Sequence, residues 1–362
     1  MPIRQHYHQL RRQVRFRQKP ALVVVAATAV VGAVVVVLAR AAGPAAFEAE
    51  TGVTTGGALV AVATGASGGS VVKFGPDGAS DITVAIAGDI QNPTSALSYG
   101  LETADLIANT IRPQYVLALG DLQYDSGTAS EFANYYTKTW GRPAVKSLTY
   151  PTPGNHEYNS SGAAPYYSYF GAANNSMNGK TVTGPANLGY YAFDVGTSWR
   201  FYSLNSEANT AAQQSWLAAD MTANPRPCTL MFTHRPYLDY SLQHDGEGAI
   251  TLPWLKMFYD NGGELVFAGH EHNYQRFQPI NPYTNQADTA RGFISFVVGT
   301  GGTTNLYNTF GATGSNSQNL VSVYSGATQG VLKLTLKPNA TYSWVYLPVT
   351  GSFSDSGSGT CH

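Results

Sequence analysis

The segment GHEHNYQRF, residues 269–277, places two histidines two positions apart, His270 and His272. It follows directly on the apolar run 265–268, which has the length and composition of a buried strand. Successive strand residues point to opposite faces, but a turn beyond the strand end can aim both imidazoles at one point. A shared metal ion is one interpretation of this pair, and two surface histidines in a polar loop are the other.

Four other predicted strands end in side chains that can bind a metal ion. The residues at these strand ends are Asp89, Asp121 with Tyr124, Asn155 with His156 and Glu157, and His234 with Arg235. Taken singly, an Asp or Asn after a strand is more often a turn or a helix cap than a ligand. Five such strand ends in succession are hard to explain by turn chemistry alone, so together they favour a metal site.

The elements that must position these residues follow from hydrophobic periodicity. Strand-like apolar runs at 82–87 and 115–119 alternate with helical spacing over 94–111 and 129–140. This alternation predicts parallel strands joined by right-handed crossovers, and ligands bind beyond the carboxyl ends of such strands. Further strands are expected at 190–195, 200–204, 229–233, 265–268, 293–298, 331–336 and 342–347, and further helices at 210–222 and 250–261.

The order of the strand-end residues resembles the calcineurin-like metallophosphoesterase superfamily, and more narrowly the purple acid phosphatases and their bacterial relatives. The shared pattern is an Asp after the first strand, then Gly-Asp-x-x-Tyr, Gly-Asn-His-Glu, a lone His and Gly-His-x-His. It covers residues 82–348 of this chain. The resemblance implies an α/β fold, a four-layer α/β/β/α sandwich with the metal site at the C-terminal ends of the strands.

The resemblance also implies two metal ions and their ligands. Two ions about 3.5–4 Å apart need a bridging carboxylate and hard oxygen and imidazole ligands on each side. The implied bridge is Asp121. The other implied ligands are Asp89, Tyr124 and His272 for one ion, and Asn155, His234 and His270 for the second ion.

Tyr124 bears on the identity of the metals. An unperturbed phenol has a pKa of about 10, so a phenolate ligand requires a strongly acidic ion such as Fe(III). The second ion implied by the resemblance is Zn, Fe or Mn. Many superfamily members carry a histidine ligand two residues after the first Asp, where this chain has Gln91. That departure supports Tyr124 as the substitute ligand.

The reaction implied by the resemblance is hydrolysis of a phosphomonoester by a hydroxide held between the ions. His156 would contact the phosphoryl group with Asn155, or donate a proton to the leaving oxygen. Arg235 and His244 are further candidates for substrate binding, and Glu157 is expected to orient His156 through its other ring nitrogen. A plain surface carboxylate is the alternative for Glu157.

Two other functions remain open at this stage. The same site could hydrolyse phosphodiesters or nucleotides. A catalytically inactive surface carbohydrate-binding protein is a third reading, because fragments such as FEAE and ASGG within residues 47–80 look like pieces of a jelly-roll carbohydrate-binding module. Residues 47–80 are too few for such a module and are expected to be a linker or a remnant of one.

The N-terminal region, residues 1–46, has the pattern of an export signal or a membrane anchor. Six basic residues precede the apolar run 21–39, which is close to the roughly 20 residues that span a bilayer. The positive flank predicts that the remainder lies outside the cell, secreted or anchored at the outer face of the membrane. Any membrane contact is then expected through this segment alone.

Charge and cysteine content narrow the partners and the compartment. Residues 47–362 carry 14 Lys and Arg against 22 Asp and Glu, a formal charge of −8. An acidic body without a basic stripe argues against nucleic acid as the main partner. Cys228 and Cys361 could pair in an oxidising compartment or stay apart. A single catalytic domain is expected over 81–350, followed by a flexible tail at 351–362.

Overall fold

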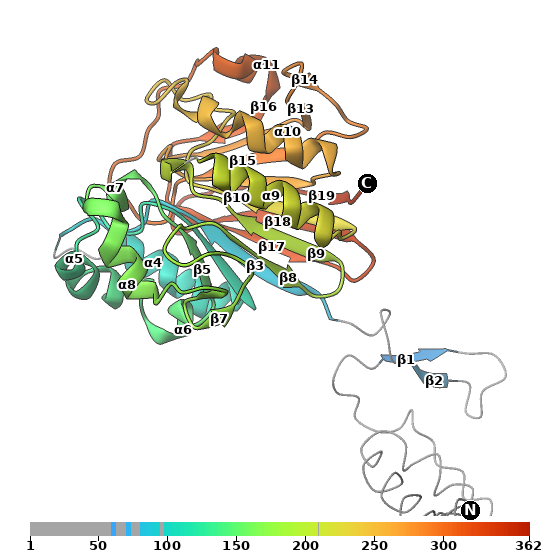
Figure 1. Ribbon diagram of the computed structural model, residues 1–362, viewed down its shortest axis with the longest axis horizontal. Coiled ribbons are helices and arrows are strands. Elements are labelled where there is room, and N and C mark those ends of the chain that lie inside the picture. The colour runs from blue at the N-terminus through green and yellow to red at the C-terminus, as the bar shows by residue number, and fades with distance from the viewer. Residues whose placement is uncertain (1–58, 63–69, 74–79, 95–97, 209) are drawn as a thin grey trace, which may run out of the picture. The chain divides into compact units, whose positions relative to one another are not determined.

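The computed structural model describes residues 59–62, 70–73, 80–94, 98–208 and 210–362, and the chain divides into two compact units, Met1–Ala79 and Ser80–His362 (Figure 1). In the first unit, strands β1 (Leu59–Val62) and β2 (Ser70–Lys73) pair antiparallel. They are the described part of the predicted linker. The predicted export segment, residues 1–46, lies outside the described residues. Within the described ranges, no helix has the length and hydrophobicity needed to cross a bilayer.

Two sheets form the second unit. The six-stranded sheet has the order β19-β18-β17-β3-β4-β5, in which β3, β4 and β5 are parallel and the other strands are antiparallel to their neighbours. Its strands are β3 (Ile82–Ala87), β4 (Tyr115–Leu119), β5 (Thr149–Thr152), β17 (Gly330–Leu336), β18 (Thr341–Pro348) and β19 (Ser356–Thr360).

The seven-stranded sheet has the order β16-β12-β15-β11-β10-β9-β8, with β9, β10, β11 and β15 parallel at its centre. Its strands are β8 (Tyr191–Val195), β9 (Trp199–Ser203), β10 (Cys228–Phe232), β11 (Leu265–Ala268), β12 (Tyr274–Phe277), β15 (Ile294–Val298) and β16 (Val321–Ser325). The short strand pairs β6 (Ser176–Met177) with β7 (Lys180–Thr181) and β13 (Ile280–Asn281) with β14 (Gln286–Ala287) lie outside both sheets.

Helices cover the outer faces of the two sheets (Figure 1). They are α4 (Ser98–Asp105) with its π-helical continuation Leu106–Ile111, α5 (Ala129–Asn134), α6 (Pro143–Lys146), α7 (Asn155–Tyr158), α8 (Ala164–Phe170), α9 (Ala211–Ala223), α10 (Leu252–Asp260) and α11 (Ser317–Leu320). Thr128 caps α5 through a reciprocal capping box with Glu131. A capping box satisfies two backbone N–H groups at a helix start, which explains why α5 begins there.

Side chains alternate between two cores along the central strands. In β10, Leu230 and Phe232 point into the core between the sheets, and Met231 points into the core shared with α9 and α10. Phe201 and Tyr202 of β9 divide in the same way. This period of two is the pattern of a sheet buried on both faces. The expected four-layer α/β/β/α sandwich is therefore confirmed.

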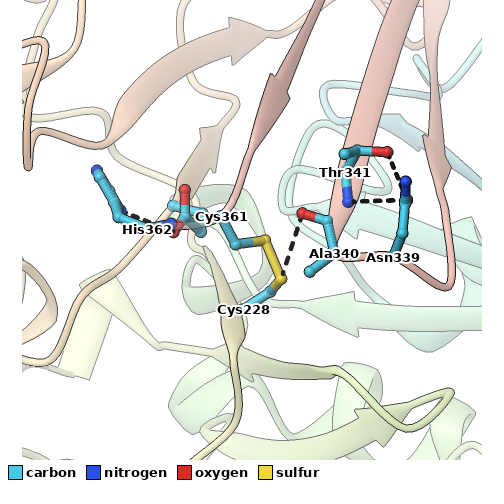
Figure 2. The surroundings of a disulfide bond; sticks show 7 residues. Cys228, Asn339, Ala340, Thr341, Cys361 and His362 are labelled. Atoms are coloured by element: carbon cyan, nitrogen blue, oxygen red, sulfur yellow. Dashed lines mark hydrogen bonds and ion pairs between the residues drawn. A yellow bond between two sulfur atoms is a disulfide. The ribbon is translucent and has the colours of Figure 1, made fainter.

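The C-terminal residues are ordered by pairing, in contrast to the flexible tail predicted for 351–362. Ser356–Thr360 forms β19, which adds antiparallel to β18. A disulfide between Cys361 and Cys228 at the start of β10 then fixes the end of the chain (Figure 2). The tail prediction was wrong because its Gly and Ser residues pair through the backbone, which needs no apolar side chains.

Removing this disulfide should destabilise the protein without touching the strand ends that carry the candidate ligands. The bridge joins residues 133 positions apart, and the entropy of closing so long a loop corresponds to about 4–5 kcal/mol, with 2–5 kcal/mol typical of native bridges. We expect the double variant Cys228→Ser and Cys361→Ser to have a free energy of unfolding, measured in urea, that is about 2–5 kcal/mol lower than that of the unaltered protein. Unchanged stability would show that the pairing of β19 with β18 and the contact of His362 with Glu264 hold the end of the chain without the disulfide.

Candidate metal centre

Three donor atoms from three strand ends meet in a first cluster. Asp89 follows β3, Tyr124 lies beyond β4, and His272 lies beyond β11. The Tyr124 hydroxyl lies 2.9 Å from Asp89 Oδ1 and 2.9 Å from His272 Nε2. His272 Nε2 lies 3.4 Å from Asp89 Oδ1, so all three atoms face a common point.

Four donor atoms meet in a second cluster. His234 Nε2 lies 3.4 Å from Asp121 Oδ2, 3.0 Å from Asn155 Oδ1 and 3.2 Å from His270 Nδ1. The ligand atoms of Asp121, His234 and His270 all lie within 4.8 Å of one another. The two clusters hold the seven residues that the sequence resemblance implied, with Asp121, the implied bridge, in the second cluster.

The backbone holds the two clusters side by side. Asp89 N–H donates to the Gly120 carbonyl at 3.0 Å, and Ile90 N–H donates to the Asp121 carbonyl at 2.9 Å. His270 N–H donates to Asp89 Oδ2 at 2.9 Å, which links a residue of the second cluster to the first. Asp89, Asp121 and His270 all have positive φ, a strained backbone conformation that concentrates at functional sites.

Backbone carbonyls and one carboxylate fix the imidazole orientations. His234 Nδ1 lies 2.9 Å from the Leu119 carbonyl and His272 Nδ1 lies 2.7 Å from the Asn305 carbonyl, so each ring presents Nε2 to its cluster. His270 is reversed, with Nδ1 in the cluster and Nε2 3.0 Å from Glu247 Oε2. In each case a proton on the outer nitrogen leaves a lone pair on the inner nitrogen, as metal ligation requires.

Burial and neighbouring charges shift the pKa values of side chains in both clusters. Burial opposes charge on His234, but the Asp121 carboxylate beside it raises the pKa of His234 to about 10. Burial and the neighbouring Asp89 carboxylate raise the pKa of Tyr124 well above its usual value. Burial and the cations around it lower the pKa of His270. In the metal-free protein, the Tyr124 hydroxyl and the His234 ring therefore hold protons that bound metal ions would displace.

The donor set and its spacing fit metal ions. Ligand atoms about 2.1 Å from a shared ion stand about 3–3.5 Å from one another, which is the spacing in both clusters. Carboxylate, phenol, amide and imidazole donors suit iron, zinc and manganese, and no thiolate is present to select a softer metal. The side-chain amide of Gln91 donates to the Asn92 carbonyl at 2.8 Å, and its backbone carbonyl accepts a hydrogen bond from Tyr124 N–H at 2.8 Å.

Glycines allow the strand ends to approach this closely. A Cβ at Gly154 would stand 2.9 Å from His234 Nε2 and closer still to Asp121 Oδ1. A Cβ at Gly269 or Gly299 would crowd Asp89 Oδ2, at 2.6 Å and 2.9 Å. The glycines that follow β15 belong to this site, although the sequence analysis did not assign them to it. Their signal was a Gly-Thr-Gly-Gly run at the end of a predicted strand.

Gly154→Ala is therefore expected to disrupt the second cluster. The added methyl must displace Asp121 or His234, so we expect bound metal to fall by about half or more and activity by at least about tenfold. Metal content by elemental analysis measures the first effect. Gly351→Ala is the control, because its positive φ gives backbone strain with nothing within 4 Å of the new methyl. Equal metal content in both variants would contradict the close packing at Gly154.

His156 lies on the open side of the clusters. Its ring Nε2 is 3.8 Å from Asp121 Oδ2, and its side chain is 29% exposed, whereas the Asp121 side chain is 2% exposed. Its backbone N–H donates to Asp121 Oδ1 at 2.9 Å. The ring also meets the Tyr124 ring edge-on at 4.3 Å between centroids. This imidazole can reach a molecule bound at the clusters without being needed as a ligand.

Glu157 has a different role from the one expected. It does not orient His156, whose Nδ1 lies 2.6 Å from the Asp125 carbonyl instead. The Glu157 carboxylate is fully buried and accepts hydrogen bonds from the backbone N–H groups of Leu122, Gln123 and Gly154. Glu157 therefore braces the turn that carries Asp121. Its burial satisfies backbone donors, which the motif alone does not reveal.

Arg235 and His244 lie beside the second cluster. Arg235 Nη1 is 3.1 Å from His270 Nε2, but the guanidinium is paired with Glu207 at 2.9 Å and with Glu247. The charge of Arg235, a candidate substrate-binding residue from the sequence, is therefore neutralised by two carboxylates. The His244 ring stacks on His270 at 4.2 Å, and its Nδ1 lies 2.7 Å from Glu271 Oε1.

Known proteins match the chain over this same region. A model of the calcineurin-like phosphoesterase family matches residues 82–274. The chain is 29% identical over 238 residues to purple acid phosphatase 21 of Arabidopsis thaliana, covering 61% of this chain and 50% of that protein. It is 26% identical over 263 residues to purple acid phosphatase 15 of the same plant, covering 60% and 44%. The chain thus spans about half the length of the curated relatives it matches.

A solved structure shares the fold. The purple acid phosphatase from yellow lupin (Lupinus luteus) seeds superimposes with a TM-score of 0.57 at 18% identity, covering 76% of this chain and 53% of that one. All seven residues of the two clusters lie within the range that the family model matches. That range is more than half of the chain. The chain therefore belongs to the calcineurin-like phosphoesterase family, and its sequence and fold are similar to those of purple acid phosphatases.

Proposed function

We propose that this protein is a metal-dependent phosphatase that holds two ions and hydrolyses phosphomonoesters. The observation that carries the proposal is the convergence of seven donor atoms from five strand ends into two adjoining clusters. Family membership supports the hydrolysis of phosphate esters. The two-ion arrangement and the preference for monoesters are our own inference from the clusters.

Asp121 is assigned as the residue shared by both ions. Asp89, Tyr124 and His272 would hold one of them, and Asn155, His234 and His270 would hold the other. When bound, the two ions supply an acidified water as nucleophile and neutralise charge on the phosphoryl oxygens. The chain contributes a buried set of ligands with fixed orientations, so little reorganisation accompanies the reaction.

His156 is assigned to the leaving group. Its Nε2 faces Asp121 from the exposed side, where an ester oxygen on the far side of the phosphorus would lie. A proton on this nitrogen can pass to the departing alkoxide, and Asn155 and His156 together would orient the phosphoryl group. His244 stands beside the second cluster, where it adds an imidazole next to His270.

The hydroxyl of Tyr124 favours Fe(III) at the first cluster. Because an unperturbed phenol has a pKa of about 10, a phenolate ligand at neutral or acidic pH requires a strongly acidic ion. We therefore propose Fe(III) in the first cluster, with Zn, Fe or Mn in the second.

Elemental analysis with a visible spectrum tests this assignment. We expect about two metal ions per chain, iron among them, and a broad visible band from phenolate ligation that Tyr124→Phe removes. Tyr136→Phe is the matched control, since it alters another buried tyrosine outside the clusters. Colourless protein that holds zinc or manganese alone would refute Fe(III) ligation by Tyr124.

Faster turnover of bis-aryl than of mono-aryl phosphates would refute the monoester preference and indicate a phosphodiesterase.

We also propose that the protein is exported. The basic and apolar pattern of residues 1–46 supports this proposal, and so does the disulfide, because such bonds persist in oxidising compartments. Recovery of the native protein outside the cytoplasm after cell fractionation tests it.

A further inference from the structure

Two loops and strand β16 carry a group of apolar side chains that the proposed chemistry does not use. We call this group the apolar rim, and it consists of Tyr240, Leu242, Tyr307, Phe310 and Tyr324. Leu242 is 54% exposed and Tyr324 is 47% exposed. Large exposed apolar side chains that gather in one place often mark a binding surface.

The rim begins at Tyr307, whose ring contacts the candidate ligand His272. The Tyr307 ring stacks on His272 at 4.4 Å with an interplanar angle of 12°, and its backbone N–H donates to the His272 carbonyl at 2.8 Å. It also meets the His244 ring at 5.5 Å, and His244 stacks on His270. Tyr307 therefore borders His272 of the first cluster directly and His270 of the second cluster through His244.

The remaining members lie on the loop of His244, on the loop of Tyr307 and on strand β16. Leu242 N–H donates to the Thr309 carbonyl at 3.0 Å, which ties the loop of His244 to the loop of Tyr307. Beyond it, the Phe310 ring lies 4.6 Å from Tyr324 and 6.0 Å from Tyr240, and Tyr240 lies 5.0 Å from Tyr324. Phe310, Tyr240 and Tyr324 thus form one aromatic group, which the backbone hydrogen bond between Leu242 and Thr309 joins to the loop of Tyr307.

The charges around the rim oppose polyanionic leaving groups. Within the described residues, the guanidinium that contacts a candidate ligand is that of Arg235, and it is already paired with Glu207 and Glu247. The Glu247 side chain is 45% exposed and would repel a second phosphate. A polyphosphate binds through cations, so the carboxylates that neutralise Arg235 disfavour such a leaving group.

We propose that the apolar rim binds the leaving group, and that the preferred substrates are phosphomonoesters of apolar alcohols, either long alkyl or aromatic. This inference rests on the proposed phosphatase function and adds the substrate class. The phosphoryl group would lie at the clusters, and the organic group would lie along Tyr307 and Leu242 toward Phe310 and Tyr324. Contact with half-exposed side chains favours each added methylene, although less than full burial does.

A series of n-alkyl phosphates tests the rim, with ethyl, butyl, hexyl and octyl phosphate assayed below their micelle concentrations. Their alcohols have similar leaving-group pKa values, so differences in kcat/KM report binding of the chain. We expect kcat/KM to rise by about 1.5- to 2-fold for each added methylene, against about fourfold for full burial. Adenosine triphosphate should be a poorer substrate than octyl phosphate.

Variants of exposed rim residues test whether the dependence of kcat/KM on chain length arises at the apolar rim. Leu242→Ser and Tyr324→Ser should flatten the dependence on chain length, while Tyr283→Ser, which removes an equally exposed tyrosine between β13 and β14, should keep it. A flat series in the unaltered protein, or an unchanged slope in both rim variants, overturns the proposal while leaving the phosphatase assignment intact. Failure to hydrolyse any phosphomonoester overturns the proposed function and the rim with it.

Discussion

Replacing Asp121 with alanine is expected to lower phosphatase activity by at least about 10³-fold, which corresponds to about 4 kcal/mol of lost transition-state stabilisation. The Asp121 carboxylate stands 3.4 Å from His234 Nε2, and it is the ligand that we propose both ions share, so its removal would leave each ion one ligand short. We expect metal content to fall together with kcat. Assays with an aryl phosphate and elemental analysis measure the two effects.

The control for this variant is Asp245→Ala, which removes an exposed carboxylate two residues from Glu247 and outside both clusters. It should keep normal activity and metal content. The circular dichroism of Asp121→Ala should remain native, because the two cores between the layers do not involve this side chain. Full activity in Asp121→Ala would remove Asp121 from the proposed chemistry altogether.

The second large effect is expected for His156→Ala. General acid catalysis contributes typically 10²–10⁴-fold, so kcat for an alkyl phosphate should fall by about that factor. Metal content should stay normal, because His156 Nε2 lies 3.8 Å from Asp121 Oδ2 and outside both sets of donor atoms. This separation of activity from metal binding distinguishes His156 from the candidate ligands.

The dependence on the leaving group identifies the role of His156. A substrate whose departing oxygen needs no proton, such as p-nitrophenyl phosphate, should lose much less activity in His156→Ala than an alkyl phosphate does. His362→Ala is the matched control, since that histidine pairs with Glu264 at the end of the chain. Equal losses for both substrates would assign His156 to phosphoryl positioning instead of proton donation.

The residues of the clusters could be predicted because their signal is local. Each lies within a few residues of a strand end, and a buried parallel strand is a short apolar run that sequence reveals. The parallel order of β3, β4 and β5 then brings Asp89, Asp121 and Asn155 to one edge. The strand ends could be located for this reason, and the family resemblance named the seven candidate ligands at them, although nothing in the sequence measures the distances between them.

Residues that support the clusters from a distance could not be predicted. The Asn305 carbonyl holds His272, Glu247 holds the outer nitrogen of His270, and Glu157 binds three backbone N–H groups. Contacts of this kind depend on how loops fold over the strand ends, and loops carry no period. Arg235 shows the same limit, because the two carboxylates that neutralise it come from other segments.

The predictions of a flexible tail at 351–362 and of one helix over 129–140 were wrong for a related reason. Ser356–Thr360 forms a strand by backbone pairing despite its small polar residues. The helix α5 ends at Asn134, and a short 3₁₀ turn, Tyr136–Lys138, follows it before Trp140 enters the core. Tertiary packing overrides local propensity in both segments.

The most direct measurement is an anomalous-difference map from a crystal of the metal-loaded protein. Two peaks should lie about 3.5–4 Å apart on either side of the Asp121 carboxylate, one next to Tyr124 and His272 and the other next to Asn155 and His234. A single peak, or peaks bound away from Asp121, would contradict the proposed pair of ions.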